Sequence, residues 1–142
     1  MHSIYSYQLH LRRPRTISMR ILISNSSADP IYEQIKDENK RQIMTEDLLD
    51  GDALPSIRKL ALDLQISVIT TKRAYDDLEK EGLITSVAGK GTFISAKNKG
   101  LLREKKMSLI ESKLAEAVLE ARAFGVDKRE LKQMLSLLLK DE

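Results

Sequence analysis

The sequence predicts a mainly helical α+β fold, in which three helical segments and a two-stranded hairpin precede two further helices. Three observations support this prediction. Helix-capping residues stand before apolar stripes of helical period. A β-branched stretch surrounds a glycine-rich turn near residue 90. Past residue 100, two more apolar stripes flank Gly125, which is a typical helix-ending residue.

The first helix is predicted to begin at Asp29-Pro30, with Asp29 as N-cap and Pro30 at the first helical position. Its apolar stripe includes Ile35 and Ile43, is interrupted by Asn39, and runs to about residue 46. Before this helix, the side chains of Met19–Ser24 alternate in the way expected of a short strand. We expect Met19 to be the natural start and residues 1–18 to be upstream or vector sequence.

The second and third helices are predicted to be short and close together. Ser56 and Ser67 are their N-caps, Gln65 separates them, and Gly82 ends the third with a Schellman stop. The inward-facing positions are Ile57, Leu60, Ala61, Leu64, Thr71, Ala74, Tyr75 and Leu78. Two helices joined by so few residues are typical of a helix-turn-helix.

Residues 84–87 and 91–95 are predicted to form a hairpin around the turn at residues 88–91. An isolated hairpin is marginal in water, so it must pack on the three helices. Three helices followed by a hairpin is the order of a winged helix-turn-helix. In that fold the third helix fits the DNA major groove and its N-terminal residues reach base edges.

Charge is unevenly distributed over the three predicted segments. The tail 1–28 has four arginines and no acid, the helix-turn-helix segment 29–96 has nine basic and thirteen acidic side chains, and the helical tail 101–142 follows a polar boundary. Because the middle segment is net acidic, DNA binding requires its cations to gather on one face. The alternative is that Arg58-Lys59 is a solvated helix face and Lys90 an ordinary turn lysine. Tyr32 and Tyr75 are assigned to the core.

Residues 30–94 resemble the N-terminal module of GntR-family regulators, and the short tail is similar to that of the YtrA-like subfamily. The matching stretches are residues 30–35, 54–61, 71–75, 78–84 and 89–93. The resemblance and the exposed helix positions together predict DNA contacts at Arg58, Ser67, Val68, Ile69, Thr70, Lys72, Arg73, Gly89 and Lys90. Val68 stands where many members have arginine and Gln65 where they have glycine. Val68 can at most touch a thymine methyl, so the operator is either A·T-rich at that step or read by shape.

The helical tail is predicted to form a homodimer. Its apolar stripe is too long for the last helix to cover, and a second copy would complete it. The predicted dimerisation residues are Met107, Ile110, Leu114, Ala117, Ala121, Phe124, Leu131, Leu135 and Leu138. The alternative is that the tail packs back on the winged module. A dimer predicts a palindromic operator, and the family resemblance implies a cytoplasmic repressor.

Other function classes are disfavoured. The chain has no cysteine, which excludes disulfides, zinc–thiolate sites and thiol nucleophiles, and both histidines lie within residues 1–18. We therefore expect no metal, no cofactor and no enzymatic activity. No apolar run approaches the roughly 18 residues that cross a bilayer. The remaining alternative is a winged-helix protein-interaction module without DNA binding.

Overall fold

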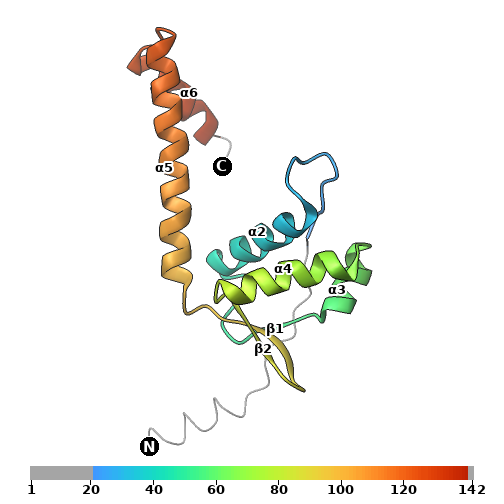
Figure 1. Ribbon diagram of the computed structural model, residues 1–142. Coiled ribbons are helices and arrows are strands. Elements are labelled where there is room, and N and C mark those ends of the chain that lie inside the picture. Colours follow the sequence, from blue (N-terminus) through green and yellow to red (C-terminus); the bar gives the residue numbers. More distant parts are fainter. Residues whose placement is uncertain (1–20, 141–142) are drawn as a thin grey trace, which may run out of the picture. The chain divides into compact units, whose positions relative to one another are not determined.

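The computed structural model describes residues 21–140 (Figure 1). Its helices and strands, in chain order, are α2 (Ile31–Met44), β1 (Ala53–Leu54), α3 (Ile57–Leu64), α4 (Val68–Lys80), β2 (Ile84–Val87), β3 (Gly91–Ile94), α5 (Lys99–Ala123) and α6 (Lys128–Leu139). The predicted class is confirmed: three helices and a winged hairpin precede two further helices. The chain divides into two compact units after Leu102.

Two serine caps place the helix-turn-helix as predicted. The Ser56 hydroxyl accepts the Lys59 backbone N–H at 3.1 Å, and the Ser67 hydroxyl accepts that of Thr70 at 3.0 Å. Between the caps, Gln65 adopts a left-handed conformation with φ 55°. A side chain in this region strains the backbone, which explains why related turns favour glycine. The turn therefore forms without its preferred residue.

The start of α2 differs from the prediction by one residue. The N-cap is Pro30, which has no side-chain hydrogen bond, so Asp29 does not cap the helix. Asp29 is instead held by Gln34, whose Nε2 donates to the Asp29 carbonyl at 3.0 Å. The same amide group accepts the Ser24 N–H at 2.8 Å and donates to the Ser24 carbonyl at 3.0 Å. Gln34 therefore ties the preceding segment to α2.

No strand forms over the described part of the predicted N-terminal strand, residues 21–24. The alternation itself is present: Ile21 is buried, Leu22 is 97 % exposed and Ile23 packs partly against the core. The Gln34 side chain occupies the backbone of Ser24 that a neighbouring strand would otherwise pair with. Met19 and residues 1–18 lie outside the described residues.

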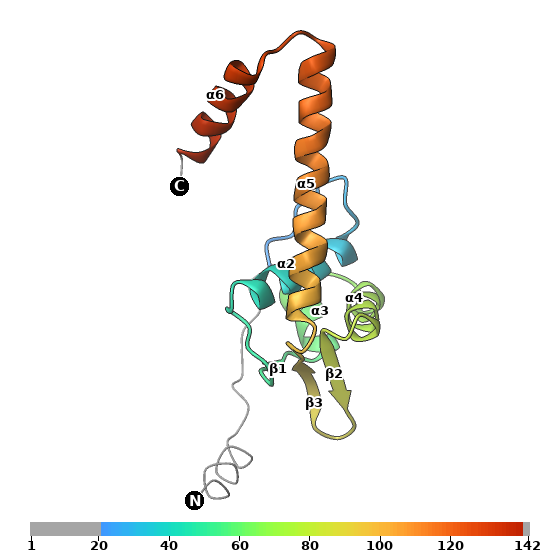
Figure 2. The same cartoon turned by 90° about the vertical axis from the view of Figure 1, so that its left-hand side faces the viewer.

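The sheet has one strand more than the predicted hairpin. Its order is β1-β3-β2 and both pairings are antiparallel. The predicted hairpin forms: it pairs Ile84 with Ile94 and Val87 with Gly91, and its tip projects from the helices (Figure 2). β1 pairs Leu54 with Thr92 along the other edge of β3. Two residues are too few to show a strand period, so β1 has no signal in the sequence.

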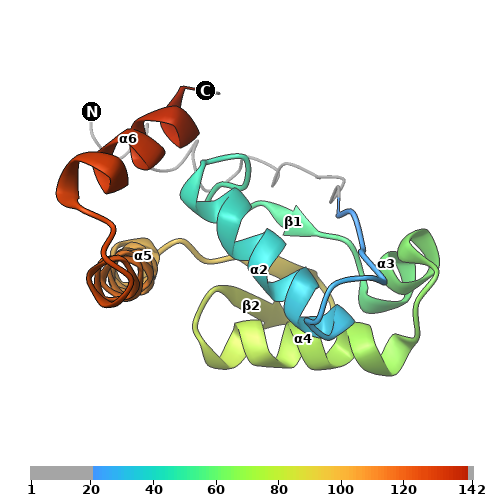
Figure 3. The ribbon, with the colours of Figure 1, turned by 90° about the horizontal axis from the view of Figure 1, so that it is seen from above.

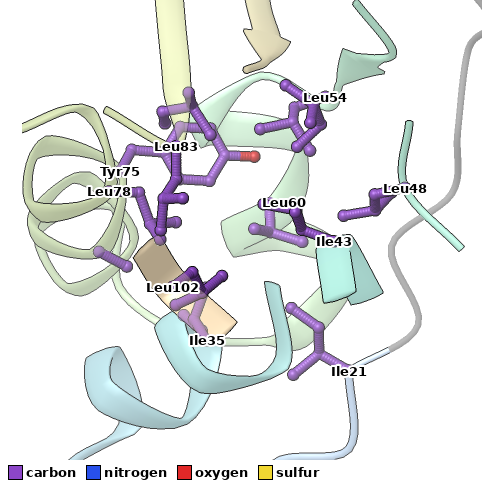
Figure 4. Close-up of a cluster of buried hydrophobic side chains, with 13 residues drawn as sticks. Ile21, Ile35, Ile43, Leu48, Leu54, Leu60, Tyr75, Leu78, Leu83 and Leu102 are labelled. Carbon is purple, nitrogen blue, oxygen red and sulfur yellow. The ribbon is translucent and has the colours of Figure 1, made fainter. Parts of the chain in front are cut away.

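The core lies where the three helices meet the sheet (Figure 4). α4 packs against both α2 and α3, and β2 packs against α4. The Tyr75 hydroxyl donates to the Pro55 carbonyl at 2.7 Å, which fixes α4 to the start of α3. Burial of this phenol raises its pKa above the ordinary range, so it stays a neutral donor. The apolar stripe predicted for α4 is confirmed as core.

Gly82 is favoured by its left-handed conformation, and it lies close to the Asn98 side chain. It has φ +75°, and the Leu83 N–H bonds to the Leu78 carbonyl at 2.9 Å in the predicted Schellman stop. A Cβ at position 82 would lie 2.5 Å from Nδ2 of Asn98. The close approach places the segment before α5 directly over the end of α4.

A buried amide in α2 predicts a stabilising substitution. Asn39 is fully buried, and neither Nδ2 nor Oδ1 finds a hydrogen-bond partner in the described part of the chain. Each buried polar group without a partner costs about 1–3 kcal/mol. Asn39→Leu is expected to raise the free energy of unfolding by about 1–2 kcal/mol, because the gain from removing the amide exceeds the cost of packing a leucine in its place. Urea unfolding would measure this; equal or lower stability would mean that the amide has a partner in solution.

Helix α5 begins at Lys99, before the predicted start at Leu102. The Lys99 N–H bonds to the Ala96 carbonyl and the Leu102 N–H to that of Asn98, so Gly100 lies inside the helix. Nζ of Lys99 also pairs with Glu46 at 2.7 Å, and that ammonium lowers the pKa of the Glu46 carboxyl. These tertiary bonds offset the weak helix propensity of glycine.

The second unit ends in α6, whose predicted cap is confirmed. Asp127 and Glu130 form a reciprocal capping box after the Gly125 stop. Of the predicted dimerisation residues, Ala121 is buried and Leu131 is half-buried; the others are exposed. Further exposed side chains lie outside the predicted stripe, namely Leu109, Leu119, Leu137 and Leu139. Among the described helices, none is both long and apolar enough to cross a membrane.

Candidate nucleic-acid interface

The first turn of α4 presents apolar side chains to solvent. Val68 is 47 % exposed and Ile69 is 82 % exposed, although both are large and hydrophobic. The next core-facing residue, Thr71, is buried and donates its hydroxyl to the Ser67 carbonyl at 3.0 Å. An apolar surface at the N-terminal end of such a helix fits the methyl group of thymine in the major groove.

The Ser67 cap engages the side chains at the start of α4. Besides accepting the Thr70 N–H, the Ser67 hydroxyl donates to Oγ1 of Thr70 at 2.7 Å. Both hydroxyls therefore lie at the helix terminus, where free N–H groups and the helix dipole favour an anion such as a phosphate. Ser67 and Thr70 were predicted as DNA contacts, and the structure gives them a structural role in addition.

Lys72 is exposed on α4, one turn after Val68, and its ammonium group is paired with a carboxylate. Its Nζ lies 2.6 Å from Oδ2 of Asp76. Lys59 on α3 is held in the same way by Asp63 at 3.2 Å. Exposed pairs at this spacing are weak, so a phosphate can replace either carboxylate at small cost. The pairing nevertheless lowers the net positive charge of the surface.

Arg58 and the wing tip supply cations without such partners. Arg58 is exposed in the first turn of α3 and Lys90 is exposed at the tip, and in residues 21–140 neither takes part in an ion pair. The Lys90 N–H bonds back to the Val87 carbonyl at 3.0 Å. Gly89 and Gly91 have φ +74° and +120°, so glycine is needed to form this tight tip.

Arg73 is joined to a residue that the sequence places in the core. Its guanidinium lies 3.7 Å from the centroid of the Tyr32 ring, and Nη2 donates to the Tyr32 hydroxyl at 3.0 Å. Tyr32 is half-buried and packs against the edge of the core, so it contributes to the core as well as to this contact. Because 41 residues separate the pair in sequence, no local spacing signals it.

The C-terminal end of α4 is acidic and is neutralised by α2. Lys36 pairs with Asp77 at 3.4 Å and with Glu81 at 3.6 Å, and Lys40 pairs with Glu81 at 2.9 Å. Partial burial acts to lower the pKa of Lys36, but Glu81, Glu33 and Asp77 outweigh it and the pKa is raised. These two carboxylates, Asp77 and Glu81, therefore lie away from the capped end of α4.

The Lys72–Asp76 pair predicts a variant that binds DNA more tightly. Asp76→Asn removes a negative charge from the candidate surface and leaves Lys72 unpaired. We expect affinity for duplex DNA to rise about threefold to tenfold at low salt. Fluorescence anisotropy would measure it. Glu79→Gln, which removes the same charge toward the other end of α4, is the matched control and should leave the affinity nearly unchanged. An unchanged affinity for Asp76→Asn would place Asp76 away from the bound duplex.

No group of three or more metal-ligating side chains occurs within the described residues. The surface consists of a helix terminus, exposed apolar side chains and dispersed cations. In protein–DNA complexes, cations and helix termini bind phosphates, and side chains in the groove recognise base edges.

Known proteins share this arrangement. The model of the family described as "Bacterial regulatory proteins, gntR family" matches residues 31–94. The HTH-type transcriptional repressor YtrA of Bacillus subtilis (strain 168) is 36 % identical over 121 residues, which cover 85 % of this chain and 93 % of that protein. A transcriptional regulator from Oenococcus oeni has a similar structure, with a TM-score of 0.67 and 29 % identity over 82 % of this chain and 97 % of that one.

A GntR family transcriptional regulator from Listeria monocytogenes is also similar, with a TM-score of 0.64 and 26 % identity over 80 % of this chain and 97 % of that one. The likeness to YtrA and to the Oenococcus structure extends past the winged module into the helical tail. The fold, the capped recognition helix and these relatives agree, and the chain belongs to the GntR family of bacterial regulatory proteins.

Proposed function

We propose that this protein is a sequence-specific, DNA-binding transcriptional repressor that acts as a homodimer. The observation that carries the proposal is the capped N-terminal end of α4, which exposes Val68 and Ile69 in a GntR-family module. Both side chains are adjacent and lie in the first turn of the helix. They are useful where a groove displays methyl groups.

The proposed contacts divide into two kinds. Val68 and Ile69 would read base edges, and Lys72 would reach either a guanine or a phosphate. Arg58 and Lys90, which lie on α3 and at the wing tip, would bind phosphates on either side of the groove. The phosphate contacts predict a steep fall of affinity with salt. They also explain how a net acidic segment can bind DNA.

The homodimer is proposed from the exposed apolar side chains of the second unit. Met107, Ile110 and Leu114 are each at least 43 % exposed, and they recur along α5 at helical spacing. Contiguous apolar surface of this kind on one chain marks an interaction site. A second copy, related by a two-fold axis, would cover it with the same side chains.

A two-fold dimer implies a palindromic operator, because two recognition helices then enter successive major grooves. Repression is proposed from the likeness to YtrA, which is named as a repressor. The proposed role is regulatory rather than catalytic, and it places the protein in the cytoplasm.

The test is a selection of genomic fragments with the purified full chain. We expect enrichment of one inverted-repeat sequence, with A·T pairs at the steps that face Val68. The double variant Arg58→Ala, Lys72→Ala should enrich nothing. If the wild-type protein enriches no sequence at low salt, the winged module would serve protein interaction instead. Enrichment of an unrepeated half-site would contradict the dimer but not the DNA binding.

A further inference from the structure

Helices α2 and α4 lie side by side and run in the same direction (Figure 3). Three side-chain pairs join them at intervals of one helical turn: Tyr32–Arg73, Lys36–Asp77 and Lys40–Glu81. The partners in each pair are 41 residues apart in the sequence. We call these pairs the first, second and third rungs.

The first rung differs chemically from the other two. In the second and third rungs a carboxylate compensates the lysine, at 3.4 Å and 2.9 Å. In the first rung the partner of Arg73 is a neutral phenol. An aromatic face attracts a guanidinium through its quadrupole and holds it in place, but it leaves the positive charge uncompensated. In the described part of the chain, Arg73 forms no ion pair.

The first rung also lies at the end where DNA binding is proposed. Tyr32 is the second residue of α2, and Arg73 is in the second turn of α4, one residue after Lys72. The compensated rungs lie toward the other end of both helices. The positioned, uncompensated cation therefore belongs to the candidate DNA surface, and the neutralised cations do not.

We propose that Tyr32 is a positioning residue, which holds the Arg73 guanidinium ready for a backbone phosphate of duplex DNA. A phosphate is favoured over a base because base edges are reached from the first turn of such a helix, where Val68 and Ile69 lie. The planar guanidinium also matches two phosphate oxygens at once. The inference rests on the proposed DNA-binding function and adds α2 to the binding surface.

The experiment measures the affinity of the full chain for a pool of random-sequence duplexes at several salt concentrations. Arg73→Gln should weaken binding about tenfold and lower the salt slope by about one for each bound subunit. Tyr32→Phe keeps the ring and should stay within about twofold of wild type. Tyr32→Leu should lose about threefold to fivefold, because the guanidinium is no longer held. Lys40→Gln, in the third rung, is the matched control and should leave the slope unchanged.

A double-variant cycle separates positioning from direct contact. If Tyr32 acts through Arg73, Tyr32→Leu should cost nothing more in the Arg73→Gln background. An equal loss in both backgrounds would show that Tyr32 contacts DNA itself, and an unchanged salt slope for Arg73→Gln would remove Arg73 from the phosphate contacts. Either result overturns the inference. Thermal unfolding of each variant checks the fold, and the salt slope of Arg73→Gln keeps the inference falsifiable if Tyr32→Leu is unstable. Failure of the wild-type chain to bind any duplex would instead overturn the proposed function.

Discussion

Leu114→Lys is expected to convert the proposed dimer to monomers and to weaken operator binding by roughly 10²- to 10⁴-fold. Leu114 is 49 % exposed in the middle of the apolar stripe on α5, so a second copy would bury it. A lysine there would bring two like charges into an apolar interface. The loss is large because binding of the second half-site is intramolecular only in a dimer. Sedimentation equilibrium and anisotropy on the selected operator measure the two effects.

Ser108→Lys is the matched control for this prediction. Ser108 is exposed on α5 and lies on the side of the helix away from the stripe. Ser108→Lys therefore adds the same charge as Leu114→Lys, but outside the proposed interface. It should remain a dimer with operator affinity near that of wild type. If Leu114→Lys also remains a dimer, the exposed stripe is not the dimer interface. If it is a monomer with full affinity, a single recognition helix suffices for the site.

The second large effect is expected for Lys72→Ala, which should weaken operator binding by about 1–3 kcal/mol. Lys72 is exposed one turn beyond the Ser67 cap, and its ammonium is restrained only by the weak pair with Asp76. In the proposed complex, Lys72 would reach into the groove and contact either a base or a phosphate. Titration of the variant against the selected operator and against random duplexes measures the loss.

Comparing the losses on the operator and on random duplexes shows which part of the DNA Lys72 contacts. A loss confined to the operator identifies Lys72 as a base reader, whereas equal losses identify a phosphate contact. Lys80→Ala removes an exposed lysine from the last turn of the same helix and should change neither affinity. If Lys72→Ala binds the operator as wild type does, the recognition helix does not enter the groove by its capped end.

The predictable features of the fold were those with local causes. The caps at Ser56, Ser67 and Asp127 and the stop at Gly82 depend on residues within one helical turn of each other. The apolar stripe of α4 has the correct period over three turns. Such signals are readable because the interacting groups are close in the sequence.

The features that were missed depend on distant partners. β1 exists because two residues meet β3 across the sheet, and the first residue of α5, Lys99, pairs with the distant Glu46. At the predicted cap, the Asp29 carbonyl instead accepts a hydrogen bond from the Gln34 side chain. A single sequence contains no local trace of such contacts.

The candidate surface was predicted in part. The exposed positions on α4 follow from the period of its buried stripe, and the Lys72–Asp76 spacing is readable as an i, i+4 pair. The stacking of Arg73 on Tyr32 is not readable, because it depends on how two helices pack. The contacts with DNA remain predictions.

The difference between the rungs makes the charge distribution of the winged module asymmetric. The uncompensated charge of Arg73 at one end and the ion-paired side chains at the Glu81 end make the charge uneven along α2 and α4. Near a polyanion, this uneven charge exerts a torque that turns the capped end inward before any contact forms. Encounters in the wrong orientation are repelled at low ionic strength. A module with net negative charge can therefore still associate rapidly with DNA, at a rate that falls as salt screens the uneven charge.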